Sequence, residues 1–249
     1  MNNQIVTLQQ LVELLYLDLG QNKDMNGYKI FEQHVKSVIE KHKEFSFKIE
    51  DGIPCIFGSL NLTDELGTIE DTYQIEIKAE ENYPYSFPLV FETGSRIPKN
   101  FDWHIFEQTG NCCIASPPEE IIICNSGLTL LSFIDNQVKN YFYSQIFRNQ
   151  NGYFLKERSH GNKGWIEFFE ETFMTDNIFN IEFGLNQIIE GKKIDRVSIC
   201  FCGSGKKYRK CHKKSYDILS KLSLDQVKFF LYTLRETNEY RLAKRNLMR

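Results

Sequence analysis

Residues 83–113 read YPYSFPLVFETGSRIPKNFDWHIFEQTGNCC. Pro84 and Pro88 remove backbone hydrogen-bond donors around a turn, and apolar side chains then alternate through 89–92 as in a β-strand. A loop carrying His104 follows, and it leads to a glycine and two adjacent cysteines. This order of strand, histidine loop, glycine and cysteine draws attention to the two cysteines at the end of the stretch.

The residues before this stretch predict one helix and three further strands. Residues 28–43 place apolar side chains on one helical face, and three alternating apolar runs follow. Asp51-Gly52 predicts a tight turn between the first two runs. Four strands with short connections favour an antiparallel meander that buries one face against a helix. The alternating residues of the four predicted strands are Phe45, Phe47 and Ile49; Ile53, Cys55 and Phe57; Tyr73, Ile75 and Ile77; and Leu89 and Phe91.

Helices are predicted on both sides of this core. Downstream, apolar residues recur every three or four positions from Leu128 to Gln145, as in a helix that crosses a sheet. Residues 165–188 predict further helical segments that bury aromatic faces. Upstream, Thr7 and Gln10 form a capping-box pattern ahead of a leucine-rich helix. The predicted fold class is therefore α+β.

The motifs of residues 83–113 resemble those of the ubiquitin-conjugating enzymes. That family has a Tyr-Pro-x-x-Pro-Pro strand, a His-Pro-Asn loop and a Gly-x-x-Cys active site in the same order and at nearly the same spacing. The resemblance implies a UBC-like fold with an N-terminal helix, a four-stranded antiparallel meander sheet and a crossover helix. It places the catalytic cysteine at Cys113, three residues after Gly110. Cys112 would face the opposite side of a strand and is expected in the core.

The chain departs from the family at the histidine loop. His104 stands nine residues before Cys113, but the tripeptide is His104-Ile105-Phe106 and contains no asparagine. Either His104 or Asn111 is a candidate to replace the missing oxyanion donor. Divergent bacterial relatives encoded with antiphage systems are similarly degenerate at this motif.

The resemblance implies an acyl transferase that uses a cysteine thioester. Cysteine is suited to this role because a thiolate is both a nucleophile and a fair leaving group. The implied donor is the C-terminus of a ubiquitin-like protein or, in cyclic-oligonucleotide antiphage systems (CBASS), of a cGAS-like nucleotidyltransferase. The acceptor is a lysine of a target protein. A separate activating enzyme is expected, because no adenylating module is recognisable here. The rival hypothesis is a catalytically inactive UBC-fold module that binds proteins.

A second motif indicates a metal site. Cys200 and Cys202 form a C-x-C pair, and Cys211 and His212 follow after eight residues. Four soft or borderline ligands suit tetrahedral Zn²⁺, and a site filled by four protein ligands is structural. The segment closely resembles the SEC-C motif, known from the C-terminus of the preprotein translocase ATPase.

Charge is distributed unevenly along the chain. Residues 191–249 contain 16 Lys/Arg and 5 Asp/Glu, whereas residues 1–190 contain 14 and 28. The basic part either pairs with the acidic part or attracts an anionic partner, such as nucleic acid or an acidic protein face. A zinc-knuckle nucleic-acid-binding protein is therefore a third hypothesis. The apolar stretches are too short to span a bilayer, and no signal peptide is recognisable. We therefore expect a soluble, cytoplasmic protein.

These patterns divide the chain into five expected parts. They are an N-terminal helical extension (1–20), a ubiquitin-conjugating-like catalytic domain (21–150), a helical extension (151–194), a SEC-C zinc knuckle (195–215) and a basic C-terminal helix (216–249).

Overall fold

The computed structural model describes residues 26–159 and 161–248. The described chain divides into two compact units. One contains residues 26–115 and 127–157, and the other contains residues 116–126 and the described residues from 158 onward. The helix expected before residue 20 lies outside the described residues. None of the helices that the structure describes is long and apolar enough to cross a membrane.

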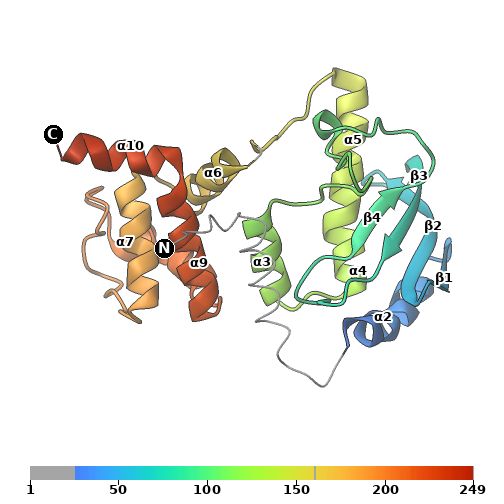
Figure 1. The fold of residues 1–249 in the computed structure, drawn as a ribbon, viewed down its shortest axis with the longest axis horizontal. Helices are drawn as coiled ribbons and strands as arrows, with labels where there is room; N and C mark the ends of the chain where they lie inside the picture. The colour runs from blue at the N-terminus through green and yellow to red at the C-terminus, as the bar shows by residue number, and fades with distance from the viewer. Residues whose placement is uncertain (1–25, 160, 249) are drawn as a thin grey trace, which may run out of the picture. The chain divides into compact units, whose positions relative to one another are not determined.

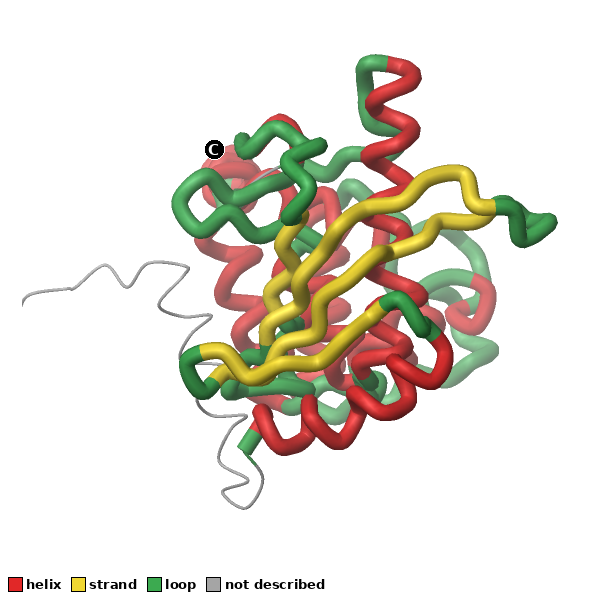
Figure 2. Tube along the Cα trace, turned by 90° about the vertical axis from the view of Figure 1, so that its right-hand side faces the viewer, coloured by secondary structure: helices red, strands yellow, loops and turns green. Residues whose placement is uncertain are grey.

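The first unit is built on a four-stranded antiparallel sheet (Figures 1 and 2). Its strands are β1 (Phe45–Glu50), β2 (Ile53–Thr63), β3 (Ile69–Lys78) and β4 (Leu89–Glu92), and they neighbour one another in chain order. Each pair is antiparallel, so the predicted meander is confirmed. The structure therefore belongs to the predicted α+β class.

The turn between β1 and β2 forms where the sequence predicted it. Asp51 and Gly52 both have positive φ angles, 50° and 80°, as the two central residues of a type I′ turn require. Glu50 and Ile53 close the ladder directly across this turn. The turn thereby fixes the register of the first two strands.

On β2 and β4, the buried residues are not all those that the alternating sequence pattern predicted. Ile56 of β2 is fully buried, whereas Phe57 is 39% exposed. On β4, Val90 and Glu92 are buried, and Phe91 lies on the outer face opposite Glu76. Apolar side chains occupy both faces of these two strands, so alternation predicted the strands without showing which face is buried. On β3 the predicted Tyr73, Ile75 and Ile77 are buried.

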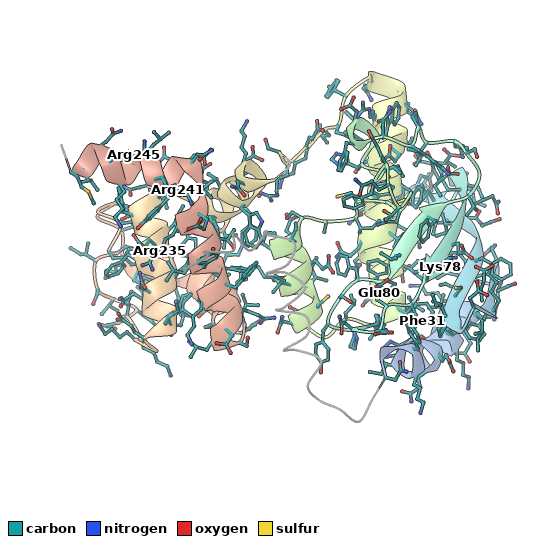
Figure 3. The ribbon with its side chains drawn as sticks, viewed as in Figure 1. Phe31, Lys78, Glu80, Arg235, Arg241 and Arg245 are labelled. Atoms are coloured by element: carbon teal, nitrogen blue, oxygen red, sulfur yellow. The ribbon has the colours of Figure 1, made fainter. Side chains whose placement is uncertain are left out.

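Helices cover the buried face of the sheet. Helix α2 (Gly27–Lys41) begins at Asn26, whose side chain accepts a hydrogen bond from the Tyr28 N–H, and it packs against β1 and β2. Phe31, labelled in Figure 3, lies on the buried side of this helix. The crossover helix is also present, and its turns are continuous from α4 through η2 to α5. The bounds are α4 (Leu130–Phe133), η2 (Ile134–Val138) and α5 (Lys139–Asn151), and η2 is a π-helical turn that the sequence pattern did not predict.

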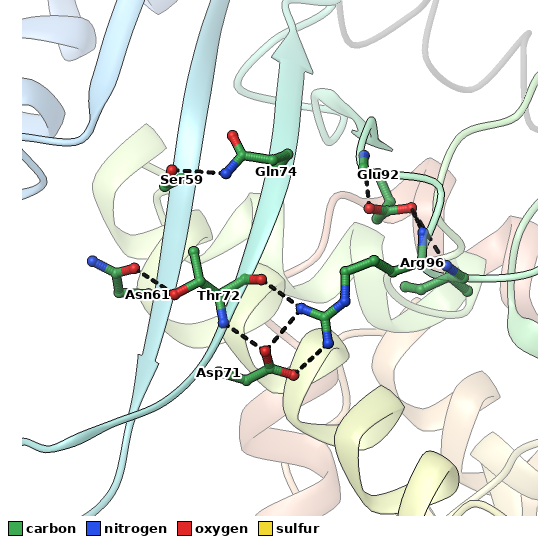
Figure 4. Close-up of polar contacts among 9 residues, drawn as sticks. Ser59, Asn61, Asp71, Thr72, Gln74, Glu92 and Arg96 are labelled. Carbon is green, nitrogen blue, oxygen red and sulfur yellow. Dashed lines mark hydrogen bonds and ion pairs between the residues drawn. The ribbon is translucent and has the colours of Figure 1, made fainter.

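A polar network ties the loop after β4 to the sheet (Figure 4). The buried Glu92 carboxylate accepts hydrogen bonds from the N–H groups of Gly94 (2.8 Å) and Arg96 (3.0 Å). The Arg96 guanidinium forms two 2.8 Å hydrogen bonds with Asp71 and lies 4.2 Å from the centroid of the Tyr73 ring. Hydrogen bonding to Arg96 lowers the pKa of Asp71, in keeping with a fixed ion pair. The network anchors the start of the loop that leads to His104.

The second unit is helical and has an aromatic core. Trp165 lies 5.3 Å from Phe230 and 5.8 Å from Phe169, measured between ring centroids, and all three side chains are buried. Ile121, from the short helix inserted between the two chain segments of the first unit, belongs to the same cluster. The predicted aromatic core of residues 165–188 is therefore confirmed. The helices of this unit are α3 (Pro117–Asn125), α6 (Asn162–Phe173), α7 (Ile178–Ile189), α8 (Lys213–Leu219), α9 (Leu224–Glu236) and α10 (Asn238–Leu247), with the single turns η1 (Phe101–Trp103) in the first unit and η3 (Tyr208–Lys210) in the second.

The basic C-terminal region forms more than the one helix expected over 216–249. Ser223 caps α9 through a capping box, and Thr237 caps α10. These two caps break the helical path, because each hydroxyl satisfies N–H groups at a new helix start. Glu182 of α7 joins the pieces by pairing with Arg235 (2.6 Å) and accepting a hydrogen bond from Tyr240 (2.9 Å). Figure 3 labels Arg235 on α9.

Candidate functional site

Cys113 lies at the base of a short hairpin. Ile105 and Cys112 form a β-bridge, and beside it the Cys113 N–H donates to the carbonyl of His104 at 2.7 Å. Gly110, with φ of 76°, allows the chain to turn back within the hairpin. His104 and Cys113 therefore stand opposite each other where the hairpin begins and ends.

The two adjacent cysteines have different environments. Cys112 is 4% exposed, and its N–H donates to the Val90 carbonyl of β4 at 2.7 Å. Burial raises the pKa of the Cys112 thiol to about 12. Cys113 is partly exposed. The expectation that Cys112 belongs to the core is confirmed, and Cys113 is the cysteine of the pair that a reactant can approach.

His104 is held from several sides. Its backbone is left-handed, with φ of 52°, at the end of η1. The imidazole lies 4.7 Å from the Phe154 ring between centroids, and its Nε2 atom is 3.6 Å from a carboxylate oxygen of Glu157. The Tyr141 hydroxyl donates to the carbonyls of Trp103 and His104, at 3.2 and 3.1 Å. Helix α5 and the segment after it thus fix both the backbone and the ring of His104.

Arg148 strengthens this support. Its guanidinium lies 4.3 Å from the Trp103 ring and 4.6 Å from the Phe154 ring, and it donates to the Asp102 carbonyl. Sequence reasoning singled out neither Phe154 nor Glu157. Both follow the end of α5 at Gly152, and no local pattern signals a contact with a residue fifty positions earlier.

The two candidate oxyanion donors lie on the same hairpin. Asn111 is 9% exposed, and its side-chain oxygen accepts a hydrogen bond from the Thr109 hydroxyl. That contact orients the amide of Asn111. In the tripeptide His104-Ile105-Phe106, Ile105 is buried and Phe106 is exposed. Only His104 in that tripeptide offers a polar side chain.

The four predicted metal ligands converge in the second unit. The donor atoms of Cys200, Cys202, Cys211 and His212 all lie within 4.8 Å of one another. His212 Nδ1 is 3.1 Å from Cys200 Sγ and 3.2 Å from Cys211 Sγ, and the sulfurs of Cys202 and Cys211 are 3.6 Å apart. Two sulfurs at about 2.3 Å from a tetrahedral ion would be about 3.8 Å apart, and a sulfur and a histidine nitrogen at about 2.0 Å from it would be about 3.5 Å apart, so the spacing fits a metal with modest expansion. The cluster can hold a metal ion.

Local backbone structure brings these ligands together. The Cys200 N–H donates to the Lys206 carbonyl at 2.8 Å, across a turn in which Gly203 and Gly205 have φ of 75° and 70°. Turn η3 then delivers Cys211 and His212 back to the first pair. Burial raises the pKa of Cys200 to about 11, so in the absence of a metal this thiol stays protonated near neutral pH. A bound metal ion deprotonates such a thiol, because the positive charge of the ion stabilises the thiolate.

A second group of potential ligands lacks the character of a metal site. Glu50, Cys55 and Glu76 also lie within 4.8 Å of one another. Lys48 and Lys78, however, each pair with both carboxylates at distances of 2.8 to 3.4 Å. The lysines already neutralise these carboxylates, and burial raises the pKa of Cys55.

Comparisons with known proteins identify no relative. No protein-family model, curated protein or solved structure matches the chain significantly. The hairpin and the metal cluster are therefore the features of the molecule that bear on its function.

Proposed function

We propose that this protein is a ubiquitin-conjugating-like acyl carrier, with Cys113 as the nucleophile. The single observation that carries the proposal is the hairpin. It presents a partly exposed cysteine opposite a fixed histidine and buries the neighbouring cysteine. The meander sheet and the helix from α4 to α5 support it, because they occur in the order that the resemblance implies.

The reaction has two steps. In the first, the Cys113 thiolate attacks the thioester carbonyl of an activated donor, and the activating partner's thiolate leaves. In the second, a lysine amine attacks the new thioester, the C–N bond forms, the C–S bond breaks, and the Cys113 sulfur departs as thiolate while the amine loses a proton. The donor is the C-terminus of a ubiquitin-like protein or of a cGAS-like nucleotidyltransferase. If the donor is the nucleotidyltransferase, the protein acts in antiphage defence.

The second step needs stabilisation of an oxyanion. A well-placed hydrogen-bond donor typically contributes about 3 kcal/mol, or about 10²-fold in rate. Asn111 and His104 are the two candidates that the hairpin offers. Whichever of Asn111 and His104 donates the hydrogen bond to the oxyanion, its substitution by alanine lowers the rate of lysine transfer by about 10²-fold and has little effect on the rate of loading.

A serine trap tests the proposal. The Cys113→Ser protein, expressed beside its partner genes, accumulates a discrete oxyester adduct that hydroxylamine removes, and intact mass identifies the donor. Cys124→Ser is a matched control, because Cys124 is buried, and this variant should form no oxyester and carry at most the labile thioester on Cys113. No adduct on Cys113→Ser would contradict the proposal.

An inactive binding module is the second candidate. The tripeptide His104-Ile105-Phe106 favours it, because Phe106, which is 37% exposed, offers no donor at the position where the family has an asparagine. If this candidate is right, Cys113→Ala leaves both conjugate levels and partner binding unchanged. The acyl-carrier proposal requires that conjugates disappear while binding persists.

The metal of the cluster is Zn²⁺ in this proposal, held by Cys200, Cys202, Cys211 and His212. Three thiolates and one imidazole suit Zn²⁺, and four protein ligands leave no position for a reacting water. The ion would hold the turn between Cys202 and Cys211 in place. Metal analysis should find about one zinc per chain, and the Cys200→Ser, Cys202→Ser double variant should lose it.

A further inference from the structure

Backbone pairing around the metal cluster gathers positive charge on one hairpin. The Tyr208 N–H donates to the Ser198 carbonyl and the Arg209 N–H to the Arg196 carbonyl, at 2.8 and 3.1 Å. A β-bridge joins Ile199 to Lys207. We call residues 196–210 the knuckle hairpin, and its five cations are Arg196, Lys206, Lys207, Arg209 and Lys210.

These five cations are exposed and lack anionic partners. All five side chains are exposed, and none forms an ion pair with any residue that the structure describes. The one acidic residue in the segment 192–214 is Asp195, whose carboxylate accepts a hydrogen bond from the Val197 N–H at 3.4 Å. Five exposed cations within residues 196–210, with no ion pair to the described part of the chain, give this segment a positive charge that attracts a polyanion.

We infer that the knuckle hairpin binds the phosphate backbone of duplex DNA. This inference is independent of the acyl-carrier chemistry at Cys113. Lys and Arg side chains that neutralise phosphates supply most of the affinity of sequence-independent binding. The major groove of B-form DNA is wide enough to admit two paired backbone segments, whereas the major groove of A-form RNA is deep and narrow.

The aromatic residues of the hairpin favour a duplex over a single strand. Single-strand binding uses exposed rings on which bases stack. Tyr208 is 3% exposed, and the Phe201 ring is turned toward His212, with a centroid distance of 4.8 Å. These rings pack inward around the metal ligands and leave the cations to make the contacts.

The test is fluorescence anisotropy of a labelled 20-base-pair DNA duplex with the zinc-loaded full chain. Five phosphate contacts predict a slope of log K against log salt of about −4.5, and hence a loss of about 500-fold between 50 and 200 mM salt. The Lys206→Gln, Lys207→Gln double variant should reduce the slope by about 2 and weaken binding. Both lysines are exposed, so this variant should fold normally.

The control removes the same charge elsewhere. Lys29 and Lys43 are exposed in the first unit, and Lys29→Gln, Lys43→Gln should leave affinity and slope close to those of the unaltered protein. The inference is overturned if the duplex does not bind, if the two double variants behave alike, or if single-stranded DNA or duplex RNA of the same length binds as tightly. Binding to anionic vesicles without binding to DNA would also overturn it.

Discussion

Selective alkylation tests the difference between the two adjacent cysteines. The protein is treated at pH 7.5 with iodoacetamide, which alkylates thiolates. With a pKa of about 12, Cys112 is ionised to only about 3 parts in 100,000 at this pH, whereas a free thiol of pKa about 8.5 is ionised to about one part in ten. Cys112 should therefore react more than 1,000-fold more slowly than a free thiol, before its 4% exposure slows it further.

Peptide mapping by mass spectrometry follows both sites on protein incubated with Zn²⁺, the metal proposed to protect the cluster cysteines. Cys113 should be modified first, and modification should abolish loading by a donor. The Cys113→Ser variant should lose the early adduct, whereas Cys112→Ser should keep it. Modification of Cys112 at a rate within tenfold of that of Cys113 would contradict this prediction, because it would show that the bridge with Ile105 does not keep Cys112 buried.

Three further predictions concern the support of the site, the metal and the pH response. Glu157→Gln should slow lysine transfer about 1.4- to fivefold without slowing loading, since a half-exposed pair with His104 contributes about 0.2–1 kcal/mol. Glu107→Gln is the exposed control in single-turnover assays. Equal effects of Glu157→Gln on loading and on transfer would contradict the positioning role. Removal of zinc by a chelator should lower the melting temperature of the helical unit while the sheet unit keeps its own transition in calorimetry, and an unchanged profile would count against a structural metal. Burial lowers the pKa of His34 below 6.5, and its Nδ1 atom lies 2.6 Å from the Tyr83 hydroxyl, so the folded protein favours the neutral ring. The contribution of His34 to the free energy of unfolding is therefore present above pH 6.5 and is lost as the pH falls below that value. Urea titrations should show that the stability of His34→Gln depends less on pH than that of the unaltered protein.

The sheet illustrates what alternation in a sequence can and cannot predict. The four strands and the Asp51-Gly52 turn were predictable, because period-two patterns and turn residues are local signals. The buried face of β4 was not, because Glu92 lies inward. It is buried since its carboxylate accepts backbone hydrogen bonds from the following loop, at distances of 2.8 to 3.4 Å. A charged residue satisfied by backbone groups has no signature in hydropathy.

The candidate sites divide along the same line. The metal ligands could be named because their spacing is itself the signal, and the structure brings all four together. Cys113 and His104 could be named only through a resemblance in motif order. Their supporting residues Phe154 and Glu157 could not, because these contacts depend on how the chain returns after α5.

Helix α3 gives the protein a discontinuous architecture. Its Ile121 belongs to the aromatic core built around Trp165, although residues 127–157 return to the other unit. During synthesis Ile121 leaves the ribosome 44 residues ahead of Trp165. The apolar side chain of Ile121 therefore stays uncovered until the rest of that core has been made. A fragment that stops after α5 would keep that face uncovered permanently. The helical unit therefore covers an apolar surface that comes from the middle of the other unit's sequence, in addition to any role of its metal or of its cations.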